Sequence, residues 1–215
     1  MTEIPEKQVV IVGAGRQGRN ALEILQIRHA VAGFLDDTRA AGDGVDGAPV
    51  LGAFNLMRDA ETIRRYAWFV AIGDNAIRQN LTGQIIEQGG VMAMAIHPAA
   101  SIAATARIEP GAYVGALCRL HSGATLDMGV LMEAGSFGGC DTRMGAFSRT
   151  GPNCVLTGGA SVGTLSFLGA GTVVGENIAV GTNCIVGANS VVLRSTGDEQ
   201  RLYGAPARPR TLASS

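Results

Sequence analysis

Residues 154–192 read CVLTGGASVGTLSFLGAGTVVGENIAVGTNCIVGANSVV, in which every sixth position from Leu156 to Val192 is a large aliphatic residue. The same period extends back to Ile102 without an insertion, and fourteen of its sixteen positions are large aliphatics. The residue two positions before each aliphatic is small in every unit except those of Val130 and Ile178, and glycine often follows the aliphatic. This pattern is a hexapeptide repeat.

The six-residue period predicts one short strand and one turn per unit, so that three units close a triangular coil. The aliphatic side chains are expected to point inward and to stack at about the 4.7–4.9 Å spacing of neighbouring strands. Small residues fit beside them at the corners, and glycine supplies positive φ at the turns. Because each coil contacts only its neighbours, the core is a column. We therefore expect a parallel β solenoid over residues 98–194.

The first part of the chain has a different pattern. Residues 8–13 (QVVIVG) predict a buried parallel strand, which runs into the complete GxGxxG motif of residues 13–18 and a helical pattern over residues 19–27. A second strand over residues 30–35 ends in Asp36-Asp37. This order is typical of a dinucleotide fingerprint, in which a phosphate binds at a helix N-terminus and an acid lies near a ribose hydroxyl.

The rest of this region predicts an α/β domain that is too small to be a complete dinucleotide-binding domain. Its expected elements are a helix over 53–66, a strand over 67–72, a helix over 76–88 and a strand over 91–96. About four strands make roughly half of a complete dinucleotide-binding domain, which favours a nucleotide or nucleotide-sugar site over a nicotinamide site. The alternative is that the glycines only permit a tight turn between strand and helix. The predicted domains are 1–97, 98–194 and a tail over 195–215.

Composition narrows the possible partners and the compartment. The formal net charge of −1 gives no general attraction to nucleic acid or to a membrane surface. The start MTEIPEKQ does not resemble a signal peptide, and no apolar run reaches 18 residues. We expect a cytoplasmic protein.

The four cysteines have no spacing typical of a metal site, and no metal is expected. Three of them, Cys118, Cys154 and Cys184, occupy the small corner position of the repeat, where cysteine behaves as a small hydrophobe. Cys140 lies outside that register, so packing does not explain it.

The combined motifs are GAGRQG at 13–18, FLDD at 34–37, AIGDNAIR at 71–78, HP at 97–98 and GAPAR at 204–208, with the coils between the last two. Over nearly its whole length the chain resembles the bacterial nucleotide-sugar acetyltransferases of the bacillosamine, perosamine and sialic-acid O-acetylation type. The resemblance implies a half-Rossmann domain followed by a left-handed parallel β-helix, and a homotrimer. It also implies acetyl-CoA as co-substrate, bound between neighbouring β-helices, and a nucleotide sugar in the N-terminal domain.

The resemblance also implies site residues. Those expected to contact the nucleotide sugar follow the strands of the first domain: Gly13, Gly15, Arg16, Gln17, Asp36, Asp37, Gly73 and Asn75. Those expected to contact acetyl-CoA lie in the coils: Arg149, Ala170 and Ala188.

One loop departs from the family pattern. The family places a catalytic histidine followed by an acid here, whereas this chain has Cys140 followed by Asp141, and a second family histidine falls on Arg149. Acetyl transfer needs a base that takes a proton as the tetrahedral intermediate forms. His121 is the remaining candidate, because it stands eighteen residues before Gly139 and therefore one coil away from the altered loop. A solvent-exposed histidine at a corner is the plainer interpretation.

Two functions therefore stay open. The first is acyl-CoA-dependent transfer to an amino or hydroxyl group of a nucleotide-linked sugar, with His121, or Cys140 together with Asp141, in place of the usual base. The second is a non-catalytic, trimeric nucleotide-sugar-binding protein. A zinc carbonic anhydrase is excluded because only His121 lies in the coils, and a nicotinamide oxidoreductase is the weakest alternative.

Overall fold

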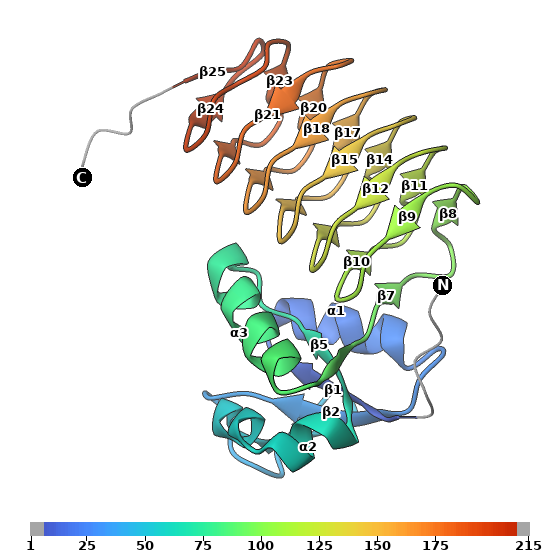
Figure 1. The fold of residues 1–215 in the computed structure, drawn as a ribbon, viewed down its shortest axis with the longest axis vertical. Helices are drawn as coiled ribbons and strands as arrows, with labels where there is room; N and C mark the ends of the chain where they lie inside the picture. The colour runs from blue at the N-terminus through green and yellow to red at the C-terminus, as the bar shows by residue number, and fades with distance from the viewer. Residues whose placement is uncertain (1–6, 210–215) are drawn as a thin grey trace. The chain divides into compact units, whose positions relative to one another are not determined.

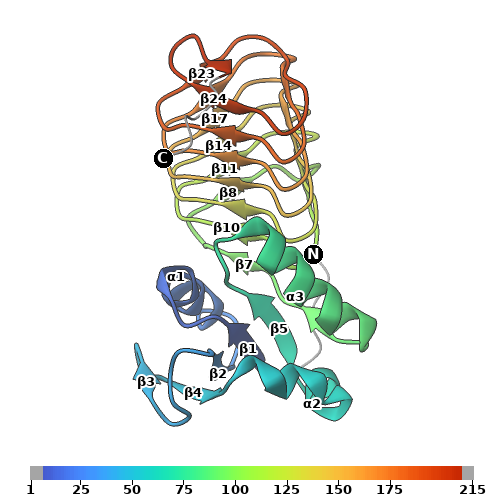
Figure 2. The same cartoon turned by 90° about the vertical axis from the view of Figure 1, so that its left-hand side faces the viewer.

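The computed structural model describes residues 7–209. The chain divides into two compact units, Met1–Ile96 and His97–Ser215. Figures 1 and 2 show the first as a sheet with helices and the second as a stack of coils.

The first unit is built on a six-stranded sheet with the order β3-β4-β2-β1-β5-β6. Strands β2, β1, β5 and β6 run parallel, and β3 and β4 form an antiparallel hairpin. The strands of this sheet are β1 Val9–Val12, β2 Val31–Leu35, β3 Gly44–Val45, β4 Ala48–Gly52, β5 Ala67–Val70 and β6 Val91–Met92, and β7 Ala95–Ile96 follows outside it. The helices are α1 Arg16–Leu25, the 3-10 helix η1 Phe54–Arg58, α2 Ala60–Arg65 and α3 Asn75–Glu87.

The two central strands are apolar along their whole length. Every residue of β1 (VVIV) and β5 (AWFV) is buried, as expected for parallel strands that are covered on both faces. Trp68 of β5 is fully buried and its indole Nε1 donates to the carbonyl oxygen of Ile63 at 2.8 Å. The sheet therefore gives a rigid base to the loops that follow its strands.

The structure differs from the sequence prediction in two places. The hairpin β3–β4 was not expected, although Asp46-Gly47 at its tip is a typical hairpin turn, with φ of 47° and 87°. The helix expected over residues 53–66 is interrupted at Asp59. The Asp59 carboxylate accepts from the backbone N–H groups of Glu61 and Thr62 and so starts a new helix, α2.

The second unit is a left-handed parallel β-helix, as predicted. Its strands are two residues long and recur every six residues: β8 Ser101–Ile102, β9 Arg107–Ile108, β10 Tyr113–Val114, β11 Arg119–Leu120, β12 Thr125–Leu126, β13 Leu131–Met132, β14 Phe137–Gly138, β15 Arg143–Met144, β16 Arg149–Thr150, β17 Val155–Leu156, β18 Ser161–Val162, β19 Phe167–Leu168, β20 Val173–Val174, β21 Ala179–Val180, β22 Ile185–Val186 and β23 Val191–Val192. After them, β24 Arg201–Tyr203 pairs in parallel with β22, and β25 Arg208–Pro209 pairs antiparallel with β24.

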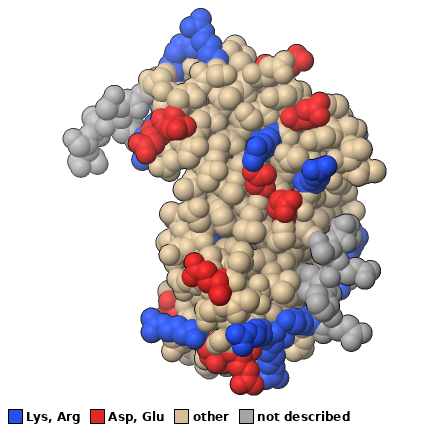
Figure 3. Space-filling view, viewed as in Figure 1, with Lys and Arg blue, Asp and Glu red and all other residues tan. Residues whose placement is uncertain are grey.

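Successive coils pair with a register of eighteen residues, for example Tyr113 with Leu131 and Leu120 with Gly138. From β11 to β23 the second residue of every strand is buried, which confirms the inward direction predicted from the repeat. On the face that Figure 3 presents, several charged side chains of both signs lie close together on the coils, and much of the surrounding surface is uncharged.

The small corner residues have a polar function as well as a small volume. The hydroxyl or thiol of a corner residue donates to the carbonyl oxygen fifteen residues later, from Cys118 to Glu133 at 3.1 Å and from Ser166 to Gly181 at 2.7 Å. Cys154 donates in the same way to Gly169 at 3.1 Å. Serine and cysteine both suit this position, because each is small and carries one donor.

Two inward positions lack an aliphatic side chain. At Gly138, an added Cβ would lie 2.9 Å from Cδ2 of Leu120 in the preceding coil. At Thr150, the hydroxyl accepts from the backbone N–H of Glu133 at 3.0 Å and lies 3.3 Å from the Ser136 hydroxyl. The interior of the column is consequently less uniform around these two residues than elsewhere.

Candidate functional site

In the first unit, the glycine loop lies against the loop that follows β5. β1 and β5 pair in parallel up to Val12 and Val70, so both chains leave the sheet at the same edge. A Cβ on Gly13 would lie 2.6 Å from Cδ1 of Ile72, and one on Gly18 would collide with the carbonyl oxygen of Gly13. A Cβ on Gly15 would meet nothing within 4 Å. Gly13 and Gly18 are thus required by packing, whereas Gly15 leaves space for a ligand.

The start of α1 is not capped by a side chain. α2 and α3 begin with Asp59 and Asp74, whose carboxylates accept from backbone N–H groups of the first turn. α1 begins after Gly15, with no side-chain cap and no acidic residue in its first turn. An exposed helix start with free N–H groups and positive partial charge suits an anion such as a phosphate.

The acid at the end of β2 holds the glycine loop. Asp36 Oδ2 accepts from the backbone N–H of Ala14 at 2.7 Å, and Oδ1 accepts from the backbone N–H of Thr38 at 2.8 Å and from its hydroxyl at 2.6 Å. Burial acts to raise the pKa of Asp36, but these hydrogen bonds outweigh it and lower the pKa below its ordinary value. Asp36 is a charged anchor between two loops.

Asp37, Gly73 and Asn75 also lie at this edge. Asp37 Oδ1 accepts from the backbone N–H of Phe54 at 2.8 Å. Gly73 lies in the loop between β5 and α3, and the side-chain oxygen of Asn75 accepts from Arg78 at 2.8 Å. Sequence reasoning overlooked Arg78 as a residue of this edge, although the motif AIGDNAIR contains it.

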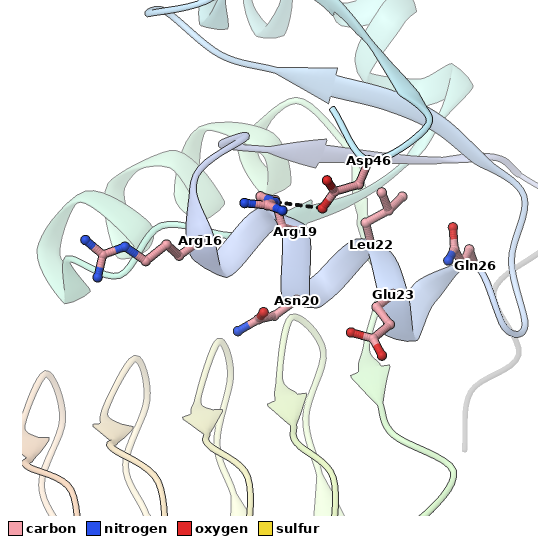
Figure 4. Close-up of a pocket in the computed structure, with 7 residues that line it drawn as sticks. All are labelled: Arg16, Arg19, Asn20, Leu22, Glu23, Gln26 and Asp46. Carbon is pink, nitrogen blue, oxygen red and sulfur yellow. Dashed lines mark hydrogen bonds and ion pairs between the residues drawn. The ribbon is translucent and has the colours of Figure 1, made fainter. Parts of the chain in front are cut away.

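Arg16 and Gln17 form the first turn of α1, and Arg16 points away from the helix in Figure 4. Arg16 also lines a surface hollow along α1, where Arg19 forms an exposed ion pair of 2.7 Å with Asp46 of the hairpin. The side-chain Nε2 of Gln17 is buried and has no hydrogen-bond partner among the described residues. A buried amide donor without an acceptor suits a site that a ligand oxygen completes.

In the second unit, His121 and Cys140 lie at the same edge of the solenoid. The His121 backbone N–H donates to the carbonyl oxygen of Gly138 at 2.9 Å, which places His121 opposite Gly139 in the next coil. The exposed His121 ring packs edge-on against Phe137, with 4.8 Å between ring centroids. Cys140 is exposed in the turn that follows β14.

Asp141 has a corner geometry that recurs along this solenoid. It adopts a left-handed conformation with φ of 56°, and its side-chain oxygen lies against Gly123 one coil earlier. The side-chain oxygens of Asn153, Asn177 and Asn189 lie against glycines of preceding coils in the same way. The direction of the Asp141 carboxylate is therefore explained by the turn.

The residues expected to contact acetyl-CoA lie at a different edge. Ala170 and Ala188 are exposed at the same corner of two successive coils, and the backbone N–H of Asn189 donates to the carbonyl oxygen of Ala170 at 2.8 Å. The Arg149 guanidinium lies 4.4 Å above the ring of Phe167. The sheet that contains β14, β17 and β20 separates this edge from that of Cys140.

Cys118, Cys154 and Cys184 are fully buried, as the repeat predicted. Burial raises the pKa of the Cys118 thiol to about 11 and also raises that of Cys154. Residues 7–209 contain no group of three or more His, Cys, Asp or Glu side chains that could bind a metal ion. No helix in this range is long and apolar enough to cross a membrane.

Comparison with known proteins gives a consistent result. The PglD N-terminal domain family matches residues 8–85. The structure of PerB from Caulobacter crescentus in complex with CoA and GDP-perosamine is 32% identical, covers 98% of this chain and 100% of that one, and has a TM-score of 0.89. The acetyltransferase domain of PglB from Neisseria gonorrhoeae in complex with acetyl coenzyme A is 28% identical, covers 95% and 100%, and has a TM-score of 0.89. WeeI from Acinetobacter baumannii, at 20% identity with coverage of 94% and 99% and a TM-score of 0.85, shares the fold.

Proposed function

Because the chain belongs to the nucleotide-sugar acetyltransferase family, we propose that it transfers an acetyl group from acetyl-CoA to the amino group of a nucleotide-linked amino sugar. PerB was solved with CoA and GDP-perosamine, and a mutant perosamine N-acetyltransferase from the same organism was solved with the same two molecules. A hydroxyl acceptor is the alternative form of the same reaction. We assign the reaction to bacterial surface-glycan biosynthesis in the cytoplasm.

The observation that carries this proposal is the uncapped start of α1. An anion is favoured there, Gly15 leaves room for it, and the Gln17 amide donor is buried without an acceptor. We assign the nucleotide diphosphate to this helix start. Asp37 and Gly73 lie at the same sheet edge and are assigned to the rest of the nucleotide sugar.

We assign acetyl-CoA to the edge with Ala170 and Ala188, and we propose a homotrimer. The outward residues of two sheets are mostly apolar, for example Phe137 and Val155 on one and Phe167 and Ile185 on another, whereas the third has Arg107, Thr125, Arg143 and Ser161. Two apolar faces suit a closed ring in which each subunit meets two neighbours. Such a ring would bring the Cys140 edge of one subunit to the Ala170 edge of the next.

The chemistry needs a base and a site for an oxyanion. The sugar amine attacks the thioester carbonyl, a C–N bond forms, and the carbonyl oxygen becomes an oxyanion that backbone N–H groups can stabilise. The amine then loses a proton to the base, the C–S bond breaks, and CoA leaves as a thiolate that takes up a proton. The products are an N-acetylated sugar nucleotide and CoA.

We propose that His121 acts as the base. Cys140, which stands at the position of the family histidine, is the neighbouring group in the site. An imidazole is the side chain whose ordinary pKa lies nearest neutrality, and the Phe137 ring orients that of His121. The Asp141 oxygen lies against Gly123 of the preceding coil, and this direction favours a corner function for Asp141 over a dyad with Cys140.

The test is release of the CoA thiol from acetyl-CoA in the presence of GDP-perosamine and of UDP-linked 4-amino sugars. We expect thiol release with at least one amino sugar, and a thermal shift with acetyl-CoA and with that sugar separately. Release with hydroxyl sugars but not with amino sugars would change the acceptor to a hydroxyl.

The altered loop favours a second candidate, a non-catalytic protein that binds nucleotide sugars. In this case a nucleotide sugar would raise the melting temperature while acetyl-CoA would not, and no thiol would be released. Absence of any shift with either ligand would contradict both candidates.

A further inference from the structure

We infer that Arg78 is a positioning residue for the nucleotide-sugar site, because its buried guanidinium holds the loop that supports the glycine loop. The inference rests on the proposed function. Arg78 is on the core-facing side of α3 together with Leu81, Thr82 and Ile85, and it is 1% exposed. An arginine is seldom buried so completely unless its N–H groups are hydrogen-bonded.

The guanidinium of Arg78 reaches back to the residues before α3. Its Nη1 donates to the carbonyl oxygen of Ile72 at 2.8 Å, and its Nη2 donates to Oδ1 of Asn75 at 2.8 Å. Its own backbone N–H donates to the carbonyl oxygen of Asp74 at 3.0 Å. One planar group therefore binds both ends of the 72–75 segment, which a single ammonium group cannot reproduce with the same geometry.

The held segment in turn limits the glycine loop. Ile72 Cδ1 lies 2.6 Å from the point where a Cβ on Gly13 would be, and the carbonyl oxygen of Ala71 lies 3.1 Å from the same point. The backbone N–H of Ala71 donates to the carbonyl oxygen of Val12 at 2.8 Å, which joins the two chains just before they diverge. A shift of Ile72 would therefore move Gly13 and the start of α1.

Asp36 holds the other side of the glycine loop through the backbone N–H of Ala14. Arg78 and Asp36 thus support the same loop from two different strand ends. Neither side chain has to touch the ligand for its loss to weaken binding, because productive contacts need their donors held to within a fraction of an ångström.

The experiment compares Arg78→Met with Leu81→Ala in the full-length protein. Met fills similar volume without donors, whereas Leu81→Ala weakens the packing of α3 and leaves the loop contacts in place. For Arg78→Met we expect a Kd for GDP, UDP or GDP-perosamine at least tenfold higher and a KM for the sugar nucleotide raised alongside it. The KM for acetyl-CoA should stay within twofold of the wild-type value, and Leu81→Ala should not show this split.

Arg78→Lys is the conservative variant, and it also carries the test if Arg78→Met does not fold. It should recover only part of the lost affinity, and full recovery would assign the effect to charge and overturn the inference. Wild-type affinity in Arg78→Met, or an equal rise in both KM values, would overturn it as well. If the wild-type protein binds no sugar nucleotide or nucleoside diphosphate, the proposed function fails and this inference fails with it.

Discussion

The two units support their functional residues in different ways. In the coils, a residue is held by its equivalents eighteen positions before and after it, as Leu120 is held between Ile102 and Gly138. In the first unit, a single side chain holds each loop: Asp36 binds the glycine loop, and Arg78 binds the neighbouring 72–75 segment. A repeated support can lose one contact and keep the others, whereas a single anchor has no substitute. Exposed coil positions should therefore tolerate changes that the anchors of the first unit do not.

The prediction with the largest expected effect tests whether equally buried positions of one coil lose the same free energy of unfolding when they are truncated. Leu120→Ala should lower the free energy of unfolding by about 2–5 kcal/mol, near the top of that range, because neighbouring Gly138 has no side chain that can fill the void. Leu126→Ala is the matched control: Leu126 is equally buried in the same coil, but its neighbour Met144 is flexible enough to fill part of the space. Denaturant unfolding of both variants measures the difference, and equal losses would show that the gap at Gly138 has no consequence.

The next effect tests the anchor Asp36. Its pKa is lower in the folded protein than in the unfolded chain, so it stabilises the fold above the unfolded value of about 3.9. This contribution is lost as the pH falls through the lower folded value. Asp36→Asn should cost about 1–3 kcal/mol at pH 7, because an amide NH2 group replaces one acceptor oxygen. Between pH 7 and pH 3, the free energy of unfolding should fall less steeply with decreasing pH in the variant than in the wild type. An equally steep fall would contradict the anchoring function of Asp36.

A smaller effect separates chemistry from stability in the coils. Cys140→Ala should lower turnover at least tenfold, about 1.4 kcal/mol in activation free energy, while the melting temperature and nucleotide-sugar binding stay unchanged. Cys140 is exposed, so its removal leaves no void. His121→Asn in the same assay tests the base. If Cys140→Ala retains wild-type turnover, Cys140 has no part in the reaction, and if His121→Asn does so, the base lies elsewhere.

The smallest effect concerns strain at one corner. Leu117 is 70% exposed and has a φ of 59°, a conformation that is unfavourable for a bulky side chain. Asn153 and Asn189 occupy the same corner in later coils with φ of 58° and 54°. Leu117→Asn should therefore raise the free energy of unfolding by up to about 1 kcal/mol. A melting temperature below that of the wild type would show that the Leu117 side chain makes a stabilising contact.

Sequence reasoning predicted the β-helix well because its signal is local and repeated. An inward residue every six positions also predicts which cysteines are buried, and it places His121 opposite Gly139. In the first unit it identified the glycine motif and the order of the main strands and helices. It missed the hairpin β3–β4, because β3 is only two residues long and leaves no alternating pattern, although the Asp46-Gly47 turn was visible.

The sequence by itself determined which residues face the interior of the coils and which loop carries Cys140, since the period of the strands and turns follows from backbone geometry. Only the tertiary structure decided which partners the polar side chains contact. Asp36 binds Ala14, Arg78 binds the loop before its own helix, and the oxygen of Asp141 lies against Gly123. These partners belong to segments one strand, one loop or one coil away. A local sequence pattern does not identify such partners, because only folding brings them together.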